Sequence, residues 1–80
     1  MMIIDIRSSS KYENGHIDGA ISIPFRELIT KYDKYLTFDE EYYIYCDSGN
    51  TSSMLVNYLN KLGYHCVNID GGYANYLLKG

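Results

Sequence analysis

The chain has 80 residues, of which 46% are hydrophobic and 21% charged, and its formal net charge at pH 7 is -3. This length and composition predict one small globular domain over residues 1–80. The seven lysines and arginines are scattered along the sequence, which excludes the clustered positive charge that nucleic-acid binding needs. No stretch approaches the ~20 apolar residues of a membrane span, and the first residues lack a signal-peptide pattern, so we expect a cytoplasmic protein that binds no membrane.

The sequence contains two cysteines, Cys46 and Cys66, and no C-x-x-C motif. Two cysteines are too few for a disulfide framework, and without paired spacing they predict neither a zinc site nor a thioredoxin-type redox pair. We therefore expect two reduced thiols, with no bound metal or organic cofactor.

The first strand is predicted over residues 2–6, an apolar run interrupted only by Asp5. Such a run is typical of a strand buried in a parallel sheet. The serines at 8–10 are expected to cap a helical turn over 11–14, which Asn14-Gly15 would close.

A loop over 15–20 then leads to a very short predicted strand over 21–23, which Pro24 ends. Apolar side chains after the proline recur at helical spacing, and this predicts a helix over 25–32. The charge-rich segment 33–40 is expected to be an exposed connection.

The second half of the chain predicts a central strand, a longer helix and a last strand. Aromatic and β-branched side chains are typical of a strand over 41–45, and apolar residues at helical spacing predict a helix over 51–62 with Gly63 at its C-terminus. Weak alternation predicts a strand over 66–69, followed by a helical turn or two over 73–78. Because strand and helix alternate throughout, we expect an α/β fold: a small parallel sheet of about four strands with helices on both faces.

Cys46 lies at the turn between the central strand and the helix that follows it. Parallel sheets bind ligands at the carboxyl ends of their strands, and the free N–H groups at a helix start favour a thiolate. Residues 47–51 have small or polar side chains, which allow a tight curl with exposed amides that would surround an anion. Cys46 is therefore the first candidate for a nucleophile, with a buried structural thiol as the alternative.

Several short motifs occur in an order and spacing that resemble a known family. They are Asp5-x-Arg7, Tyr12, Gly15-His16-Ile17-Asp18-Gly19-Ala20 leading to Pro24, Tyr45-Cys46, Ser48-Gly49-Asn50, Gly63-Tyr64 and Gly71-Gly72-Tyr73. Together they cover essentially the whole chain, which resembles a single-domain rhodanese, a sulfurtransferase-type module.

The resemblance implies that Cys46 is the catalytic nucleophile and carries a persulfide during turnover. Asp5 and Arg7 would be structural partners near the active-site end, and His16 would hold its own turn. The substrate-binding loop, whose backbone N–H groups would wrap the outer sulfur, would consist of Asp47, Ser48, Gly49, Asn50, Thr51 and Ser52.

This sequence departs from the family pattern at several positions. Many members carry arginine directly after the cysteine and several carry it near the end of the loop, where this chain has Asp47 and Thr51. A cation for an anionic donor such as thiosulfate is therefore missing, and Asp47 would weaken thiosulfate binding or raise the pKa of the thiol. Asp18 stands where proline is common, and an N-terminal strand or helix that many members possess is absent, so we expect a fold shortened at its termini.

The rhodanese fold also resembles a phosphatase type, whose cysteine loop is one residue longer and ends in an arginine that grips phosphate. The only arginines here are Arg7 and Arg26, and both precede Cys46. Hydrolysis of phosphate esters is therefore disfavoured.

Other polar residues are interpreted more simply. Cys66 is expected in the core of the last strand rather than as a resolving thiol for Cys46, and His65 is expected to be exposed. Ser52 and Ser53 are expected to cap the helix that follows the loop, because no acid–base partner is indicated for either hydroxyl.

Two functions from different classes follow. In the first, the protein is a sulfurtransferase that moves a sulfane sulfur through a persulfide on Cys46 to a thiol or other thiophilic acceptor. The donor would be a small sulfur-containing anion such as thiosulfate, or a protein persulfide. In the alternative, it is a non-catalytic or weakly active binding or sulfur-carrier module that acts with a partner protein.

Overall fold

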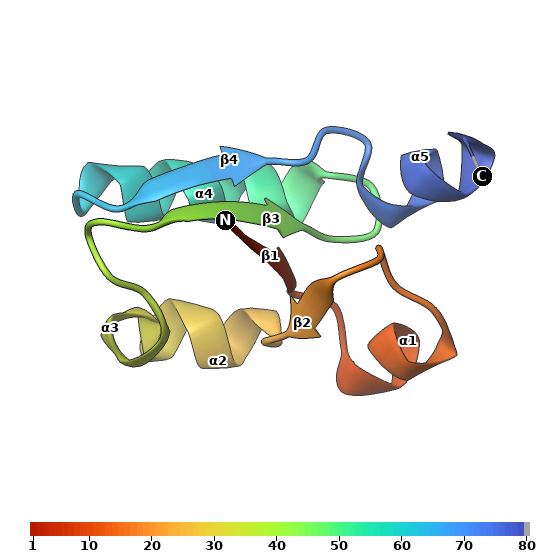
Figure 1. Ribbon diagram of the computed structural model, residues 1–80, viewed down its shortest axis with the longest axis horizontal. Helices are drawn as coiled ribbons and strands as arrows, with labels where there is room; N and C mark the ends of the chain where they lie inside the picture. The colour runs from red at the N-terminus through yellow and green to blue at the C-terminus, as the bar shows by residue number, and fades with distance from the viewer. Residues whose placement is uncertain (80) are drawn as a thin grey trace.

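The computed structural model describes residues 1–79 and contains one four-stranded parallel sheet, with the strand order β2, β1, β3, β4 (Figure 1). The strands are β1 (Met2–Asp5), β2 (Ala20–Ser22), β3 (Glu41–Tyr45) and β4 (His65–Asn68). The helices are α1 (Ser9–Asn14), α2 (Phe25–Thr30), α3 (Tyr32–Tyr35), α4 (Asn50–Lys61) and α5 (Gly72–Lys79). The predicted α/β class with about four parallel strands is confirmed.

The register of the sheet brings the carboxyl ends of its strands to one edge. Ile3 of β1 pairs with Ala20 of β2 and Tyr43 of β3, and Tyr43 pairs in turn with Val67 of β4. Figure 1 shows that the arrowheads of β3 and β4 point toward the end of the molecule where α1 and α5 lie. The segments that follow β1, β3 and β4 therefore meet at that end.

Helices cover both faces of the sheet, as predicted. Side chains of α2, α3 and α4 pack on one face in the larger core cluster, around the fully buried Ile4 and Ile44. On the other face, Tyr12 of α1 and Tyr73 of α5 pack against a smaller cluster that includes the fully buried Tyr45.

The prediction of one helix over 25–32 followed by an exposed connection was wrong in part. The structure has two helices, α2 and α3, with Lys31 between them, and α3 extends into the segment expected to be exposed. Leu36, directly after α3, is only 4% exposed and belongs to the larger core cluster. Burial of apolar side chains in this charge-rich stretch accounts for the extra helical turn. The first helix also begins earlier than predicted, at Ser9, because the hydroxyl of Ser8 accepts a hydrogen bond from the Lys11 amide.

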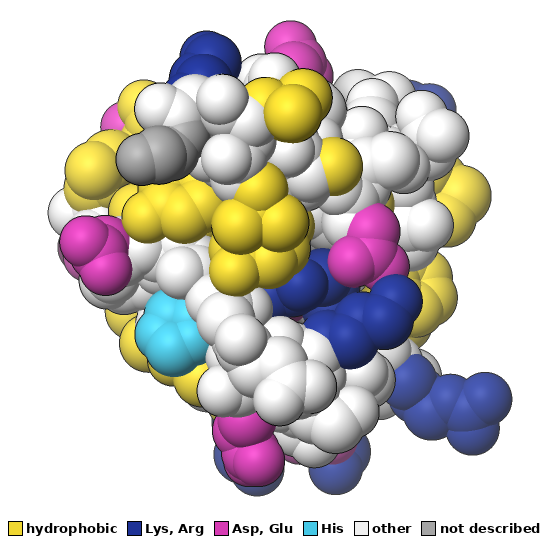
Figure 2. Space-filling view, turned by 90° about the vertical axis from the view of Figure 1, so that its right-hand side faces the viewer, with side chains coloured by type: hydrophobic (Ala, Val, Ile, Leu, Met, Phe, Trp, Pro, Cys, Tyr) yellow, Lys and Arg dark blue, Asp and Glu magenta, His cyan; other side chains and the backbone are white. Residues whose placement is uncertain are grey.

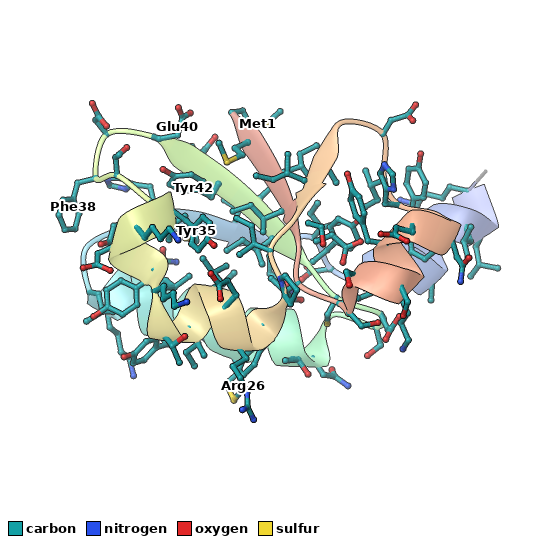
Figure 3. The ribbon with its side chains drawn as sticks, turned by 90° about the horizontal axis from the view of Figure 1, so that it is seen from below. Met1, Arg26, Tyr35, Phe38, Glu40 and Tyr42 are labelled. Carbon is teal, nitrogen blue, oxygen red and sulfur yellow. The ribbon has the colours of Figure 1, made fainter. Side chains whose placement is uncertain are left out.

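The end of the sheet away from the arrowheads is closed by contacts between α3, β3 and the N-terminus. Tyr35 of α3 packs against the larger core cluster, which includes Tyr42 of β3, whereas Figure 3 shows Phe38 and Arg26 projecting outward. The hydroxyl of Tyr42 accepts a hydrogen bond of 2.7 Å from the Thr37 amide, and the Met1 ammonium lies 3.2 Å from the Glu40 carboxylate. Within residues 1–79, no helix has the length and apolar character needed to cross a bilayer.

Candidate active site

Cys46 is the first residue after β3, at the carboxyl edge of the sheet, and only 8% of it is exposed. β3 lies between β1 and β4, so this position is central in the sheet. The chain then curls through residues 47–49 and enters α4 at Asn50. The thiol therefore lies beneath a short loop at the N-terminus of the longest helix of residues 1–79.

Hydrogen-bond donors converge on the sulfur. The backbone amide of Gly49 lies 3.2 Å from Cys46 Sγ and the amide of Ser52 lies 3.4 Å from it. The neutral thiol itself donates to the Ser52 hydroxyl oxygen, which lies 3.3 Å from the sulfur. Burial raises the pKa of the Cys46 thiol, but hydrogen bonds from the Ser52 side chain and from the amides of Ser52, Gly49 and Ser48 outweigh burial and lower that pKa. The arrangement favours a buried thiolate.

Gly49 allows the loop to curl. It has a φ of 100°, in the left-handed region, and directly precedes α4 as its N-cap residue. A Cβ at this position would lie 3.0 Å from the amide nitrogen of Gly71, so the loop also packs closely against the start of α5.

The first turn of α5 holds the loop from the other side. The amides of Tyr73 and Ala74 donate hydrogen bonds of 2.9 and 3.0 Å to the carbonyls of Cys46 and Asp47. Gly72 has a φ of 56°, and a Cβ there would clash with the Cys46 carbonyl oxygen. The N–H groups that a helix start leaves unpaired thus bind the reactive loop directly.

A buried ion pair lies next to the loop, at the end of β1. Arg7 donates two hydrogen bonds from Nε and one from Nη2 to the Asp5 carboxylate, and both residues are buried. The Tyr45 hydroxyl donates to the same carboxylate at 2.7 Å, and Arg7 Nη2 also donates to the Gly15 carbonyl. Burial raises the pKa of Asp5, but the hydrogen bonds from Arg7 and Tyr45 outweigh burial and lower it. These contacts join β1 and β3 to the turn after α1.

Asp47 is paired with two cations at the surface. Its carboxylate lies 2.8 Å from Lys11 Nζ of α1 and 3.7 Å from Arg7 Nη1, and its side chain is 56% exposed. Figure 2 views this end of the molecule and shows lysine and arginine side chains beside an acidic one, bordered by hydrophobic side chains. The pKa of the Cys46 thiol is lowered overall because the donors on the sulfur outweigh burial, and the expected effect of Asp47 on that pKa stays a prediction.

The side chains of Ser48, Asn50 and Thr51 are exposed around the loop. His16 hydrogen-bonds through Nδ1 to the Tyr12 carbonyl at 2.8 Å and stacks on the Tyr12 ring, so its contacts lie within its own turn.

The sequence did not indicate two contacts of this site. Lys11 reaches Asp47 from a helix 36 residues earlier in the chain. Asn68, at the end of β4, accepts a hydrogen bond of 2.6 Å from the Ser52 hydroxyl. The capping role expected for Ser52 was wrong: the N-cap of α4 is Gly49, and Ser52 is fully buried inside the first turns of the helix. The only local sequence feature that could have indicated this buried position of Ser52 was a serine flanked by small residues at the helix start.

Cys66 lies in β4, where it is paired with Tyr42 of β3. Tyr42 precedes Cys46 by four positions, which corresponds to about 13 Å along a strand. Cys66 is buried in the larger core cluster, and burial raises the pKa of its thiol to about 11. The two thiols are therefore distant from each other and differ in environment. Within residues 1–79 there is no group of three or more potential ligand side chains placed to bind a metal ion.

Comparisons with known proteins agree with this arrangement. Among solved structures, the chain is similar to a rhodanese-related protein from Thermoplasma volcanium, with a TM-score of 0.89 and 33% identity, covering 99% of this chain and 78% of that one. Among curated proteins, it is 29% identical to the thiosulfate sulfurtransferase GlpE of Tolumonas auensis over 92% of this chain and 70% of the relative.

A further relative is the putative sulfur carrier protein YrkF of Bacillus subtilis, which is 37% identical over 78% of this chain. The chain spans a third or less of the length of that protein and of one other curated relative. The family model described as the rhodanese-like domain matches residues 1–79. The chain therefore belongs to the rhodanese-like domain family.

Proposed function

We propose that the protein transfers sulfane sulfur through a persulfide on Cys46. The observation that carries this proposal is the convergence of the Gly49 and Ser52 amides on a buried sulfur at 3.2 and 3.4 Å. Fixed amide dipoles in a water-poor site stabilise an anionic sulfur more strongly than water does, because they need no reorganisation. The names of relatives such as GlpE add support from sulfur chemistry in the same family.

The reaction consists of two displacements at sulfur. In the first, the Cys46 thiolate attacks the outer sulfur of the donor; a new S–S bond forms while the donor's own bond to that sulfur breaks, and its electron pair leaves with the rest of the donor. In the second, a thiophilic acceptor attacks the outer sulfur of the persulfide, and the electron pair of the S–S bond returns to Cys46. The outer sulfur needs no external oxidant or reductant in either step.

The charges beside the loop favour a donor with little net charge, such as a protein persulfide, over thiosulfate. Lys11 and Arg7 are the cations beside Asp47, and both already face carboxylates: Lys11 faces Asp47, and Arg7 faces Asp5 and Asp47. A dianion would have to compete with those carboxylates for the same positive charge. The expected acceptor is a thiol, in a reducing compartment such as the cytoplasm, where Cys46 remains available as thiolate.

Turnover with thiosulfate and cyanide, followed as thiocyanate formation, tests the proposal. We expect slow turnover by the wild-type protein, none by Cys46→Ala, and a wild-type rate for the matched control Cys66→Ala if that variant remains folded. Equal thiocyanate formation by Cys46→Ala and the wild-type protein would contradict the assignment of Cys46.

The relation to a putative sulfur carrier supports a second candidate, a carrier module that is loaded by a partner protein. In that case Cys46 would accept sulfur from a protein persulfide, yet cyanide and thiosulfate would give no multiple turnover. Loading with a persulfidated donor protein, measured in parallel with the thiocyanate assay, separates the two functions.

A further inference from the structure

The Ser52 hydroxyl lies between two groups that can accept its hydrogen. Ser52 is fully buried, with Oγ 2.6 Å from Asn68 Oδ1 and 3.3 Å from Cys46 Sγ. A hydroxyl carries one hydrogen, so Ser52 can donate to only one of these acceptors at a time.

The orientation of the Asn68 amide decides which acceptor is favoured. Asn68 Nδ2 lies 2.9 Å from the Asp70 carboxylate and 3.4 Å from the Gly49 carbonyl. Carboxylate and carbonyl oxygens only accept, so the NH2 group must face them, and Oδ1 must face Ser52. Since Oδ1 cannot donate, the Ser52 hydrogen points to Asn68. The neutral thiol then donates its own hydrogen to Ser52 Oγ.

We propose that Asn68 is a positioning residue that competes with the Cys46 thiolate for the hydroxyl hydrogen of Ser52. This inference rests on the proposed function and concerns the same sulfur. While Asn68 holds the hydrogen, the thiolate is stabilised mainly by the two backbone amides and remains the stronger nucleophile. When the hydrogen turns to the sulfur, the thiolate is more stable and less nucleophilic.

This competition would balance the two displacements. Attack on the donor benefits from a basic thiolate, whereas release of sulfur to the acceptor benefits from a stable one, because Cys46 is then the leaving group. Rotation of the Ser52 hydroxyl alone would switch the Cys46 thiolate between its more nucleophilic and its more stable form, without a movement of the backbone.

The charged groups around this triad come from four parts of the fold. Asp70 binds Asn68 from the segment after β4, and Asp47 from the loop is paired with Lys11 of α1. Asp5 and Arg7, at the end of β1, pair with each other. The first turn of α4, residues 50–53, carries no charged side chain. A change at Asn68 therefore alters the hydrogen bond to Ser52 without removing a charge.

The pH dependence of Cys46 alkylation by iodoacetamide measures the effect. Replacing Asn68 with alanine removes the competing acceptor, so we expect the pKa of Cys46 to fall by about one unit, a tenfold rise in the ratio of thiolate to thiol. Asn68→Val, which has no acceptor and suits a strand, should act in the same way. Cys46 and Cys66 lie on opposite sides of Lys61, so tryptic peptides report each thiol separately.

Ser52→Ala completes the test as a double-mutant cycle. In the Asn68→Ala background it should raise the pKa of Cys46 by about the amount that Asn68→Ala lowered it, whereas in the wild-type background it should change the pKa less. Asn60→Ala is the matched control: the Asn60 amide makes two hydrogen bonds, both to the backbone of Cys66, and its loss should leave the Cys46 profile unchanged.

The outcomes separate this inference from the proposed function. Folded Asn68→Ala and Asn68→Val proteins with the wild-type pKa at Cys46 would overturn the role of Asn68, while a Cys46 that does not react below the pH range of an ordinary thiol would overturn the proposed nucleophile. On the wild-type protein, the side-chain amide NMR signals of Asn68 should titrate together with Cys46. Signals that stay constant through that titration would also refute the competition.

Discussion

At the scale of single residues, Asp47 shows how a charge beside a reactive group depends on its partners. From the sequence alone it is an anion next to a nucleophilic sulfur, but its carboxylate lies 2.8 Å from Lys11 Nζ and its side chain is largely in solvent. Exposed ion pairs of this kind contribute little to stability. The pair matters for the choice of donor, because an anionic donor would have to compete with Asp47 for the charge of Lys11.

Removing the charge of Asp47 should therefore improve the use of an anionic donor. We expect Asp47→Asn to lower the KM for thiosulfate about threefold at low salt, and the gain should disappear at high salt because the interaction is screened. Adding Lys11→Met should reverse the gain. Asp39→Asn, which removes the same charge before the start of β3, should leave KM unchanged, and an equal effect of both aspartates would argue against a local role of Lys11.

Asp5 is the residue for which the structure predicts a dependence of stability on pH. Its folded pKa is lowered, so its carboxylate stabilises the fold above the unfolded value of about 3.9, and that contribution is lost as the pH falls through the folded pKa. Asp5→Asn should cost about 3 kcal/mol near neutral pH, because it leaves buried Arg7 unpaired, and should flatten the loss of stability below about pH 4. Tyr45→Phe, which removes one hydrogen bond to the carboxylate, should be intermediate.

Urea unfolding between pH 2 and pH 7 measures this series. The stability of Asp5→Asn should fall less steeply with acid than that of the wild-type protein. Parallel curves for the two proteins would exclude Asp5 as a source of the acid sensitivity.

At the scale of elements, the start of α5 fixes the cysteine loop. The amides of Tyr73 and Ala74 bind the loop carbonyls, and Gly72 lies so close to Cys46 that no side chain fits. The loop is thus positioned by an element that begins 26 residues after the cysteine it supports. The positions of the loop amides around the sulfur therefore depend on this long-range contact.

Gly72→Ala tests that contact. The added Cβ would clash with the Cys46 backbone, so we expect a loss of about 3 kcal/mol or more in the free energy of unfolding, together with a loss of sulfur transfer. Gly19→Ala is the control, since Gly19 also has a positive φ but has no neighbouring atom within 4 Å of the new Cβ. That variant should lose only about 1 kcal/mol in urea unfolding. Equal losses would mean that backbone strain, rather than the contact with the loop, determines the cost.

At the scale of the whole molecule, the sequence predicted the architecture well. Alternating strand and helix patterns predicted the parallel sheet, and the position of Cys46 at a strand-to-helix turn predicted its place at the carboxyl edge. The α2–α3 break was missed because Leu36 is buried and Tyr35 is partly buried by tertiary packing that local charge density does not reveal. Lys11 and Asn68 were missed because each meets the loop from an element distant in the chain, and no local pattern encodes such a contact.

The placement of the two thiols is also a property of the whole molecule. Cys66 is separated from Cys46 by about four strand positions, or about 13 Å, and lies in the core. Treatment with oxidised glutathione should therefore give a mixed disulfide on Cys46 and no internal disulfide, as judged by peptide mass mapping. A peptide linking the two cysteines in folded protein would contradict this separation.

Sulfur transfer through Cys46 can be measured directly as the intact mass of the protein after incubation with a sulfane donor and removal of the excess. We expect the wild-type protein to gain one sulfur atom, located on the peptide of Cys46. This gain should be lost on addition of a thiol or cyanide and should be absent from Cys46→Ala. No mass gain with either thiosulfate or a protein persulfide, or a gain that persists in Cys46→Ala, would contradict the claim that Cys46 carries the sulfur.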